Sequence, residues 1–184
     1  MVALETPICN FGWNAPDFDL LGTDGRNYQF DDIKGSKGTL VMFICNHCPY
    51  VKAVINDIAN DIKELEALGI KAAAIMSNDI KNYPDDSFEN MIGFSKIHNF
   101  SFPYLIDETQ NIAKEYGAVC TPDFFGYNNN LELQYRGRFR ELKNLKPVAK
   151  GDSDLKVAMK LIGKTGKGPA NQIPSMGCNI KWFK

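Results

Sequence analysis

The sequence lacks a surplus of charge of either sign. Its 21 Lys and Arg residues nearly balance its 22 Asp and Glu residues, which leaves a formal net charge of −1. A near-neutral chain has no excess of basic side chains with which to attract nucleic acid or an anionic membrane surface. We therefore expect neither nucleic acid nor a membrane as a partner.

Long apolar runs are lacking as well. No segment approaches the roughly 20 apolar residues that a membrane-spanning helix needs. The N-terminal stretch MVALETPICNFGW has no basic start followed by an apolar run, so we expect no export signal and a cytoplasmic protein. There is no internal repeat and no linker that would divide the chain. We therefore expect residues 1–184 to form one domain, with a Gly/Pro-rich and candidate disordered tail from about residue 163.

Cysteine is sparse and odd in number: the chain has Cys9, Cys45, Cys48, Cys120 and Cys178. An odd count in a reducing compartment argues against a framework of structural disulfides and favours metal or redox chemistry. A structural zinc site needs four ligands, usually supplied as two close pairs, and only one close pair exists here. We therefore expect no metal ion and no other cofactor.

The close pair lies in the stretch FICNHCPY, residues 43–50. The apolar run at residues 39–44 predicts a buried strand, and apolar residues then recur at helical spacing from Pro49 to Gly69. Proline is tolerated in the first turn of such a helix. The two cysteines are thus predicted at a strand-to-helix junction, where unpaired N–H groups favour a thiolate. This position indicates chemistry for the pair rather than packing.

The rest of the chain alternates between predicted strands and helices. A turn-forming run of three asparagines, residues 128–130, then separates two apolar segments and predicts a hairpin. This order predicts an α/β protein with a central mixed sheet and helices on both faces. Strands are expected at residues 70–76 and 102–107, and helices at residues 87–98, 108–117 and 153–162.

A CxxC pair after a buried strand, with Thr121-Pro122 well downstream before a hairpin, resembles the thioredoxin fold. In that family the proline is cis and packs against the cysteine pair. The residue before the proline offers backbone hydrogen bonds to a bound peptide or mixed disulfide. The resemblance therefore implies that Thr121 and Pro122 bind substrate.

Two further segments, APDFDLLGTDG (15–25) and FPYLIDETQNIAKEYGA (102–118), are similar to the peroxiredoxin branch of that fold, including its N-terminal β-hairpin extension. The segments CNHCPY, YRGR and GCNIKW resemble a peroxiredoxin-like subgroup. On these motifs the chain is identified as a thioredoxin-fold protein (glutathione peroxidase/peroxiredoxin-like) of the AhpC/TSA-type, or redoxin, group, carrying a CxxC motif.

The two parent families imply different reactive cysteines. In thioredoxins the first cysteine, here Cys45, is the exposed nucleophile, and the second, here Cys48, resolves the mixed disulfide. In peroxiredoxins the peroxidatic cysteine aligns with Cys48, and a threonine stands at the position of Cys45. That threonine is replaced here, and the peroxiredoxin arginine is missing from residues 119–122. Peroxide reduction needs such groups to stabilise developing charge.

We therefore favour a thiol–disulfide oxidoreductase of cell redox homeostasis that cycles a Cys45–Cys48 disulfide. Its substrate would be a protein or small-molecule disulfide or thiol, and its electron donor is unknown. A peroxiredoxin-like antioxidant peroxidase using Cys48 is the second hypothesis. A redox-inactive thioredoxin-fold binding module is the third. We interpret Arg136 and Arg138, in the stretch RGRFR, as a solvated strand edge rather than as replacements for the missing arginine.

The thioredoxin pattern also lacks its buried carboxylate, because residues 39–44 contain no acid. Proton transfer would then use water, His47 or another group. His47 directly precedes Cys48, and we predict that it stabilises a thiolate and makes the disulfide more oxidising than that of thioredoxin.

Two cysteines outside the pair are possible accessory thiols. Cys120 directly precedes Thr121 and is expected near the pair if the fold assignment holds. Cys178 lies near the C-terminus, where we expect Ile180, Trp182 and Phe183 to dock the chain end on the domain. We therefore predict a role for Cys178 that is closer to structural than catalytic.

Overall fold

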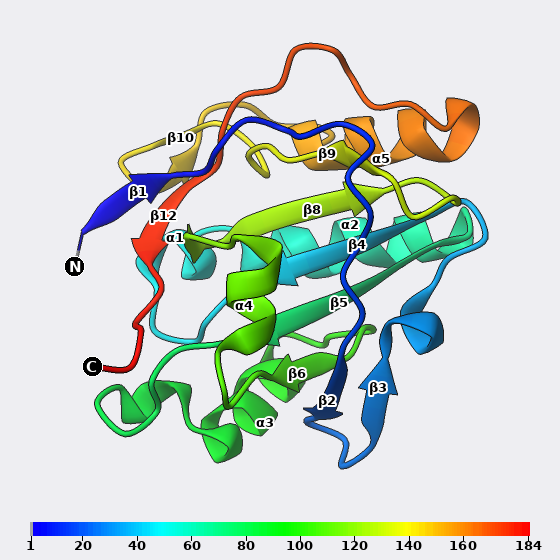
Figure 1. Cartoon of the computed structure of the whole chain (residues 1–184). Helices are drawn as coiled ribbons and strands as arrows, with labels where there is room; N and C mark the ends of the chain where they lie inside the picture. The colour runs from blue at the N-terminus through cyan, green and yellow to red at the C-terminus, as the bar shows by residue number, and fades with distance from the viewer. Residues whose placement is uncertain (1) are drawn as a thin grey trace.

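The computed structural model describes residues 2–184 and centres on a seven-stranded mixed sheet (Figure 1). The strand order is β3-β2-β6-β5-β4-β8-β9, in which β4, β5 and β6 run parallel and the other neighbours are antiparallel. The predicted thioredoxin fold is confirmed, and β2–β3 is its expected N-terminal hairpin. The strands are β2 (Asp19–Gly22), β3 (Asn27–Gln29), β4 (Gly38–Phe43), β5 (Ile70–Met76), β6 (Tyr104–Ile106), β8 (Asp123–Tyr127) and β9 (Leu133–Tyr135).

Helices cover both faces of this sheet, with α4 in front of it and α2 and α5 behind it in Figure 1. Among the described residues, no helix combines the length and the apolar character needed to cross a membrane. The helices are η1 (Phe30–Ile33), α1 (Pro49–Lys52), α2 (Ile55–Ala67), η2 (Pro84–Asp86), α3 (Phe88–Ile97), α4 (Asn111–Tyr116) and α5 (Asp154–Thr165).

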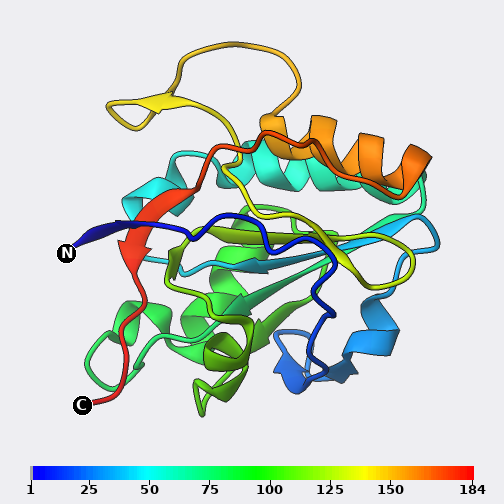
Figure 2. The same ribbon diagram turned by 45° about the horizontal axis from the view of Figure 1, so that its top comes forward.

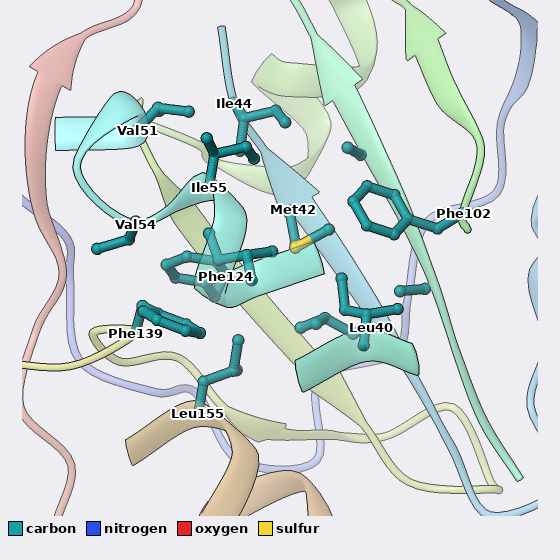
Figure 3. Close-up of a cluster of buried hydrophobic side chains, with 14 of the residues drawn as sticks. Leu40, Met42, Ile44, Val51, Val54, Ile55, Phe102, Phe124, Phe139 and Leu155 are labelled. Atoms are coloured by element: carbon teal, nitrogen blue, oxygen red, sulfur yellow. The ribbon is translucent and has the colours of Figure 1, made fainter. Parts of the chain in front are cut away.

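Strand β4 runs through the middle of the core, and every one of its residues is buried. Leu40 and Met42 belong to the apolar cluster on one face of the sheet, and Val41 and Phe43 to the cluster on the other, as the two-residue period of a strand requires. Because both faces are covered, the strand is a continuous apolar run in the sequence. Figure 3 shows the first cluster, in which Leu40 and Met42 pack with side chains from α2 and α5.

The helix predicted from Pro49 to Gly69 is two helices in the structure. Between α1 and α2, Val54 has φ −128° and ψ −5°, outside the helical region. Its N–H bonds to the carbonyl of Val51, three residues back, instead of continuing the α-helical pattern. Apolar spacing missed this break because Val51 before it and Ile55 after it are both buried. The change of direction brings α1 into contact with β12, whereas α2 packs on β5 and α5.

A second, smaller sheet joins the two ends of the chain. Strand β12 (Met176–Asn179) lies between β1 (Ala3–Glu5) and β7 (Cys120–Thr121) and is antiparallel to both. Figure 2 shows β1 and β12 side by side, close to the two termini. A separate hairpin consists of β10 (Leu142–Lys143) and β11 (Lys146–Pro147).

The Gly/Pro-rich stretch that composition marks as candidate disorder lies against the domain. Helix α5 continues beyond residue 163 and ends at Gly166, which has the left-handed φ of 75°. The carbonyl of Ile173 then accepts a hydrogen bond from the N–H of Arg138, and that of Ser175 accepts one from Thr6. The prediction of disorder is wrong because these backbone contacts come from distant segments, which composition does not reveal.

The chain end docks as expected, but through a different set of residues. Ile180 is buried in the core cluster on the α4 face. Trp182 and Phe183 remain 38% and 48% exposed. The backbone of Lys181 supplies the rest of the anchor, because its N–H bonds to Asn78 at 2.8 Å and its carbonyl accepts the N–H of Asp79.

Candidate active site

The cysteine pair occupies the loop between β4 and α1, the predicted strand-to-helix junction. Cys48 directly precedes α1 with an extended backbone, and Pro49 takes the first helical position. The carbonyl of Cys48 accepts the N–H of Lys52 and so closes the single turn of α1. Cys45 and Cys48 are only 1% and 0% exposed. Cys45 is therefore not the exposed cysteine that the resemblance to thioredoxins implies.

Strand β12 brings a third sulfur to this pair. The Sγ of Cys178 lies 2.9 Å from the Sγ of Cys48, although the two residues are 130 positions apart in the sequence. The side chains of Cys45 and Cys178 both affect the ionisation of Cys48. Sequence reasoning named Cys178 only as an accessory thiol because its spacing contains nothing that predicts this contact.

The surroundings of Cys48 favour its thiolate. The hydrogen bond with Cys45 outweighs burial, and further hydrogen bonds with the Cys178 side chain and with the N–H groups of Val51 and Cys178 also favour the charged form. Together they lower the pKa of Cys48 from 9.0 to about 5. The carbonyl oxygen of Thr121, 3.1 Å away, can accept a hydrogen bond only from the thiol form and therefore opposes ionisation. One acceptor thus faces several donors, and we assign the thiolate to Cys48.

The two neighbouring thiols keep their protons. The hydrogen bond to Cys48, burial and the negative charge of Asp86 raise the pKa of Cys45 well above its ordinary value. Burial and the hydrogen bond to Cys48 raise the pKa of Cys178 to about 12. The surroundings therefore favour the negative charge of the reduced site on Cys48 and the protonated form of Cys45 and Cys178.

Thr121 and Pro122, the predicted substrate-binding residues, lie against the cysteines. Their peptide bond is cis, as the resemblance implies, and the Oγ1 of Thr121 is 3.3 Å from the Sγ of Cys45. The backbone edge at Thr121 is already paired, because Thr121 lies opposite Cys178 in the β7–β12 register. In this structure the chain's own strand therefore covers the edge where a substrate peptide was expected.

His47 is held by a carboxylate. Its Nδ1 lies 2.6 Å from the Oδ2 of Asp86, and its ring stacks on Tyr83 with 5.7 Å between the ring centroids. A ring nitrogen lies within 4.8 Å of the Sγ of Cys45. The expected closeness of the imidazole to a sulfur is thus found at Cys45.

Asp86 is the functional candidate that sequence reasoning missed. Its fully buried carboxylate accepts hydrogen bonds at 2.8 Å from the N–H of Asn46 and from the Nδ2 of Asn78, in addition to His47. Burial raises the pKa of this carboxyl, but the hydrogen bonds, led by that from His47, outweigh burial and lower it. The strand before the cysteines contains no acid, yet Asp86 reaches the same loop from η2. In the sequence Asp86 is one acidic residue in a polar loop after an apolar strand, which does not distinguish it from surface acids.

Among the described residues, Cys45, His47 and Asp86 form a group that could hold a metal ion. One donor atom from each lies within 4.8 Å of the other two. A sulfur, a nitrogen and an oxygen ligand are compatible with zinc, which takes four ligands in structural sites and keeps an open position in catalytic ones. The Asp86 carboxylate already accepts hydrogen bonds from three residues, however. We therefore interpret the cluster through thiol chemistry.

The remaining candidates are engaged in packing. Burial and the charge of Asp123 raise the pKa of the Cys120 thiol far above its ordinary value, and its Sγ contacts the carbonyl of Pro122 at 3.7 Å. The interpretation of Arg136 as a solvated edge residue is wrong, because Arg136 is 8% exposed and its guanidinium pairs with buried Asp123 at 3.0 Å. Arg138 pairs with Asp154 at 2.6 Å. Carboxylates thus hold both guanidinium groups.

A pocket of about 240 Å³ opens beside the site. Tyr50, Pro122 and the β12 residue Met176 are among the side chains that line it. A molecule in this pocket would therefore meet Pro122 and β12 before it reached the buried sulfurs.

The model of the AhpC/TSA family matches residues 11–140, which is most of the chain. Among curated proteins, the thiol-disulfide oxidoreductase ResA of Bacillus subtilis (strain 168) is 26% identical over 117 residues. That alignment covers 64% of this chain and 61% of ResA, so the chain spans less than two thirds of this curated relative.

Two solved structures match the chain over nearly its whole length. An uncharacterised conserved protein from Geobacillus kaustophilus is 37% identical, with a TM-score of 0.94 over 100% of this chain and 97% of its own. A hypothetical protein from Sinorhizobium meliloti 1021 is 35% identical, with a TM-score of 0.89 over 97% of each chain. The small sheet and the C-terminal strand therefore fall within a region that these structures share with this chain.

Proposed function

The chain belongs to the AhpC/TSA family, and we propose that its reaction is thiol–disulfide exchange through a reversible Cys45–Cys48 disulfide. A redox function at thiols is supported at the level of the family and of the curated relative. The observation that carries the finer proposal is that both sulfurs meet at Thr121: the Sγ of Cys45 lies 3.3 Å from its Oγ1, and the Sγ of Cys48 lies 3.1 Å from its carbonyl oxygen. The two sulfurs that would form the bond are therefore held at one residue, and the thiolate favoured at Cys48 starts the exchange.

We assign the first attack to Cys48, because the environment of that sulfur favours the thiolate. The Cys48 thiolate attacks one sulfur of a substrate disulfide, and the other substrate sulfur leaves as a thiolate that takes up a proton. Cys45, once deprotonated, then attacks Cys48 in the mixed disulfide. The second substrate thiol leaves, and the Cys45–Cys48 disulfide remains. Two electrons have passed to the substrate, and an external dithiol donor of unknown identity returns them.

Asp86 and His47 are the groups nearest to the proton that Cys45 must lose. The negative charge of Asp86 raises the pKa of Cys45, and a ring nitrogen of His47 lies within 4.8 Å of the Cys45 sulfur. In this proposal His47, oriented by Asp86, accepts that proton as Cys45 attacks.

Access to the sulfurs limits the substrate. Both cysteines of the pair are buried, and β12 covers the edge at Thr121. A folded protein disulfide can therefore react only after β12 shifts, whereas a small disulfide needs a smaller opening beside Pro122. We propose a small-molecule or exposed peptide disulfide as the substrate and the cytoplasm as the compartment.

The experiment is disulfide mapping. The reduced protein is exposed to limiting oxidised glutathione, quenched in acid and alkylated before peptide analysis. We expect a Cys45–Cys48 disulfide that dithiothreitol reverses and that also forms in the Cys178→Ser variant. If both thiols stay reduced in Cys178→Ser, the proposed function is wrong. Cys9→Ser is the matched control, because Cys9 is a half-buried thiol outside the cluster.

A peroxidase reaction is the second candidate function. A pKa of about 5 would make Cys48 a thiolate at neutral pH, and a buried sulfur suits a substrate as small as hydrogen peroxide. In that reaction the Cys48 thiolate would take one peroxide oxygen to become a sulfenic acid, and the other oxygen would leave as hydroxide. A neighbouring thiol would then condense with the sulfenic acid to give a disulfide and water.

A further inference from the structure

We infer that Cys178 is a third redox cysteine, which exchanges with the Cys45–Cys48 disulfide to form a Cys48–Cys178 disulfide inside the same chain. This inference rests on the proposed function, because it uses the disulfide proposed there as its starting material. It assigns to β12 a chemical role that neither the CxxC motif nor the family match contains.

The sulfur positions carry the inference. The Sγ atoms of Cys48 and Cys178 are 2.9 Å apart, so no third heavy atom can lie between them. A disulfide bond is about 2.05 Å long, and closing the remaining distance needs a shift of about 1 Å or less. Both side chains are buried, at 0% and 3% exposure, so water and external thiols are kept away from this contact.

The position of Cys178 is set by a strand that is held on both sides. In β12, Cys178 lies opposite Thr121 of β7 and opposite Ala3 of β1. A slip by one residue would turn the Cys178 side chain to the other face of this sheet. The register that aims this thiol at Cys48 is therefore fixed by pairing with two other strands.

Gly177 allows the strand to approach this closely. A Cβ at position 177 would lie 2.1 Å from the carbonyl oxygen of Thr121 and 3.0 Å from the nitrogen of Pro122. Both contacts are with backbone atoms, which cannot turn aside as a flexible side chain can. Any side chain at this position must therefore push β12, and Cys178 with it, away from the site.

The proposed step balances without an added oxidant. The Cys178 thiol gives up a proton, which Cys45 takes up by the end of the step, and the Cys178 thiolate attacks the Sγ of Cys48 in the Cys45–Cys48 disulfide. The Cys48–Cys178 bond forms as the Cys45–Cys48 bond breaks, and Cys45 leaves as a thiolate that takes up a proton. One disulfide is exchanged for another, so the chain is neither oxidised nor reduced by this step.

The step changes which sulfur is available. With the bond between Cys48 and Cys178, Cys45 becomes a thiol beside His47 and Asp86, and β12 is tied covalently to the loop before α1. Reduction then has to release β12 before the thiolate of Cys48 returns. The C-terminal strand thus becomes part of the redox cycle.

The test maps disulfides in variants after oxidation by limiting oxidised glutathione. In Cys45→Ser we expect an intramolecular Cys48–Cys178 disulfide, and in the wild type we expect both disulfides, with equal losses of alkylatable Cys178 and gains of alkylatable Cys45 as they interconvert. If Cys178 stays fully alkylatable in Cys45→Ser, or pairs only between chains, the inference is overturned. Because Cys45–Cys48 formation in Cys178→Ser is scored separately, failure of the inference and failure of the proposed function give different results.

A second variant tests the part played by β12. Gly177→Ala on the Cys45→Ser background should lose the Cys48–Cys178 disulfide, because the added methyl group displaces the strand. The single variant Gly177→Ala, which keeps Cys45, should still form the Cys45–Cys48 disulfide. That result would show that the loop before α1 is intact. An undiminished yield of Cys48–Cys178 in the Gly177→Ala variant would contradict the register argument.

Discussion

The reactivity of Cys48 depends on the residues that face its sulfur. Thiols on two sides and N–H groups of the backbone donate to it, and they lower its pKa to about 5. The sequence around Cys48 does not show that these thiols would lie near its sulfur. His47, which directly precedes Cys48 and was expected to stabilise the thiolate, forms its hydrogen bond with Asp86.

We predict that titration of thiolate absorbance in the reduced protein gives a pKa near 5 that disappears in Cys48→Ser. In Cys45→Ala the pKa of Cys48 should rise toward the ordinary 9.0, because the largest stabilising hydrogen bond is lost. Cys9→Ala should leave the titration unchanged. A Cys48 pKa near 9.0 in the wild type would contradict the assignment of the thiolate.

The same shift predicts how the stability of the reduced protein depends on pH. The folded pKa of Cys48 lies below the unfolded value, so its thiolate stabilises the folded state fully above pH 9.0, and this contribution is lost as pH falls through about 5. The free energy of unfolding should therefore rise between pH 5 and 9. Chemical denaturation of wild type and Cys48→Ser across this range measures the difference in slope.

Asp86→Asn should destabilise the protein by about 3 kcal/mol, because the amide cannot accept all the hydrogen bonds that the buried carboxylate receives. The pKa of Cys45 should fall, since the negative charge that raises it is removed. The folded pKa of Asp86 is below 3.8, so the stability difference should hold above pH 3.8 and shrink in stronger acid.

Asp85→Asn is the matched control for this prediction, because Asp85 is the neighbouring acid and its side chain is exposed. Its effect on stability should stay within about 0.5 kcal/mol. Equal effects of the two substitutions in urea unfolding would show that Asp86 does not organise the cysteine loop.

Strand β12 is the element that separates this site from an open CxxC site. It covers the edge at Thr121, supplies Cys178 and follows a tail whose backbone is bonded to the domain. The break between α1 and α2 contributes too, because it lets α1 contact β12. Access to the thiols therefore depends on how firmly β12 is held in its sheet.

Ile180→Ala should loosen that strand. Ile180 is 1% exposed, and removing such a side chain typically costs about 2–5 kcal/mol. We expect a lower melting temperature and faster alkylation of Cys48 in the native protein. Trp182→Ala should have a smaller effect on both, at about 1 kcal/mol or less, because Trp182 is 38% exposed. Unchanged alkylation in Ile180→Ala would mean that β12 does not control access.

The whole molecule combines a peroxiredoxin-like fold with a site that lacks the threonine and the free arginine of peroxiredoxins. The position of the peroxide-orienting threonine is Cys45, and Arg136 is committed to Asp123 and stacks over Phe125 at 4.5 Å. The donors that face Cys48 lower its pKa, but they are thiols and N–H groups rather than a cation. The frame thus stabilises a thiolate without supplying the guanidinium that peroxide cleavage would use.

We therefore predict slow reaction with hydrogen peroxide. Loss of one group that stabilises a developing charge typically costs a factor on the order of 10²–10³, and the second-order rate constant should fall below that of ordinary peroxiredoxins by at least that factor. Stopped-flow fluorescence of the reduced protein measures it, with Cys48→Ser as the blank. A rate comparable to ordinary peroxiredoxins would favour the peroxidase as the function and Cys48 as its peroxidatic residue.

Local patterns were sufficient for most of the frame. The apolar run at residues 39–44, the proline after Cys48, the glycine that ends α4 and the asparagine run between β8 and β9 each specify a strand, a helix start, a helix end or a turn through short-range sterics and hydrogen bonding. Two predictions about the backbone failed, the uninterrupted helix after Pro49 and the disordered tail. In both, contacts with β12 or with the body of the domain decide the backbone.

The sequence by itself indicated an α/β protein with a mixed sheet and placed the cysteine pair at the start of a helix, because strand period, helix spacing and proline geometry act over a few residues. The resemblance to thioredoxins added the specific fold and the Thr121-Pro122 segment beside the pair. Only the tertiary structure decided which cysteine carries the negative charge, which acidic residue accepts hydrogen bonds from the cysteine loop and which strand covers the site. Asp86 is 38 positions beyond Cys48 and Cys178 is 130 positions beyond it. Hydrogen bonds and burial act through space, and sequence spacing carries no record of which distant residues the folded chain brings within about 3 Å.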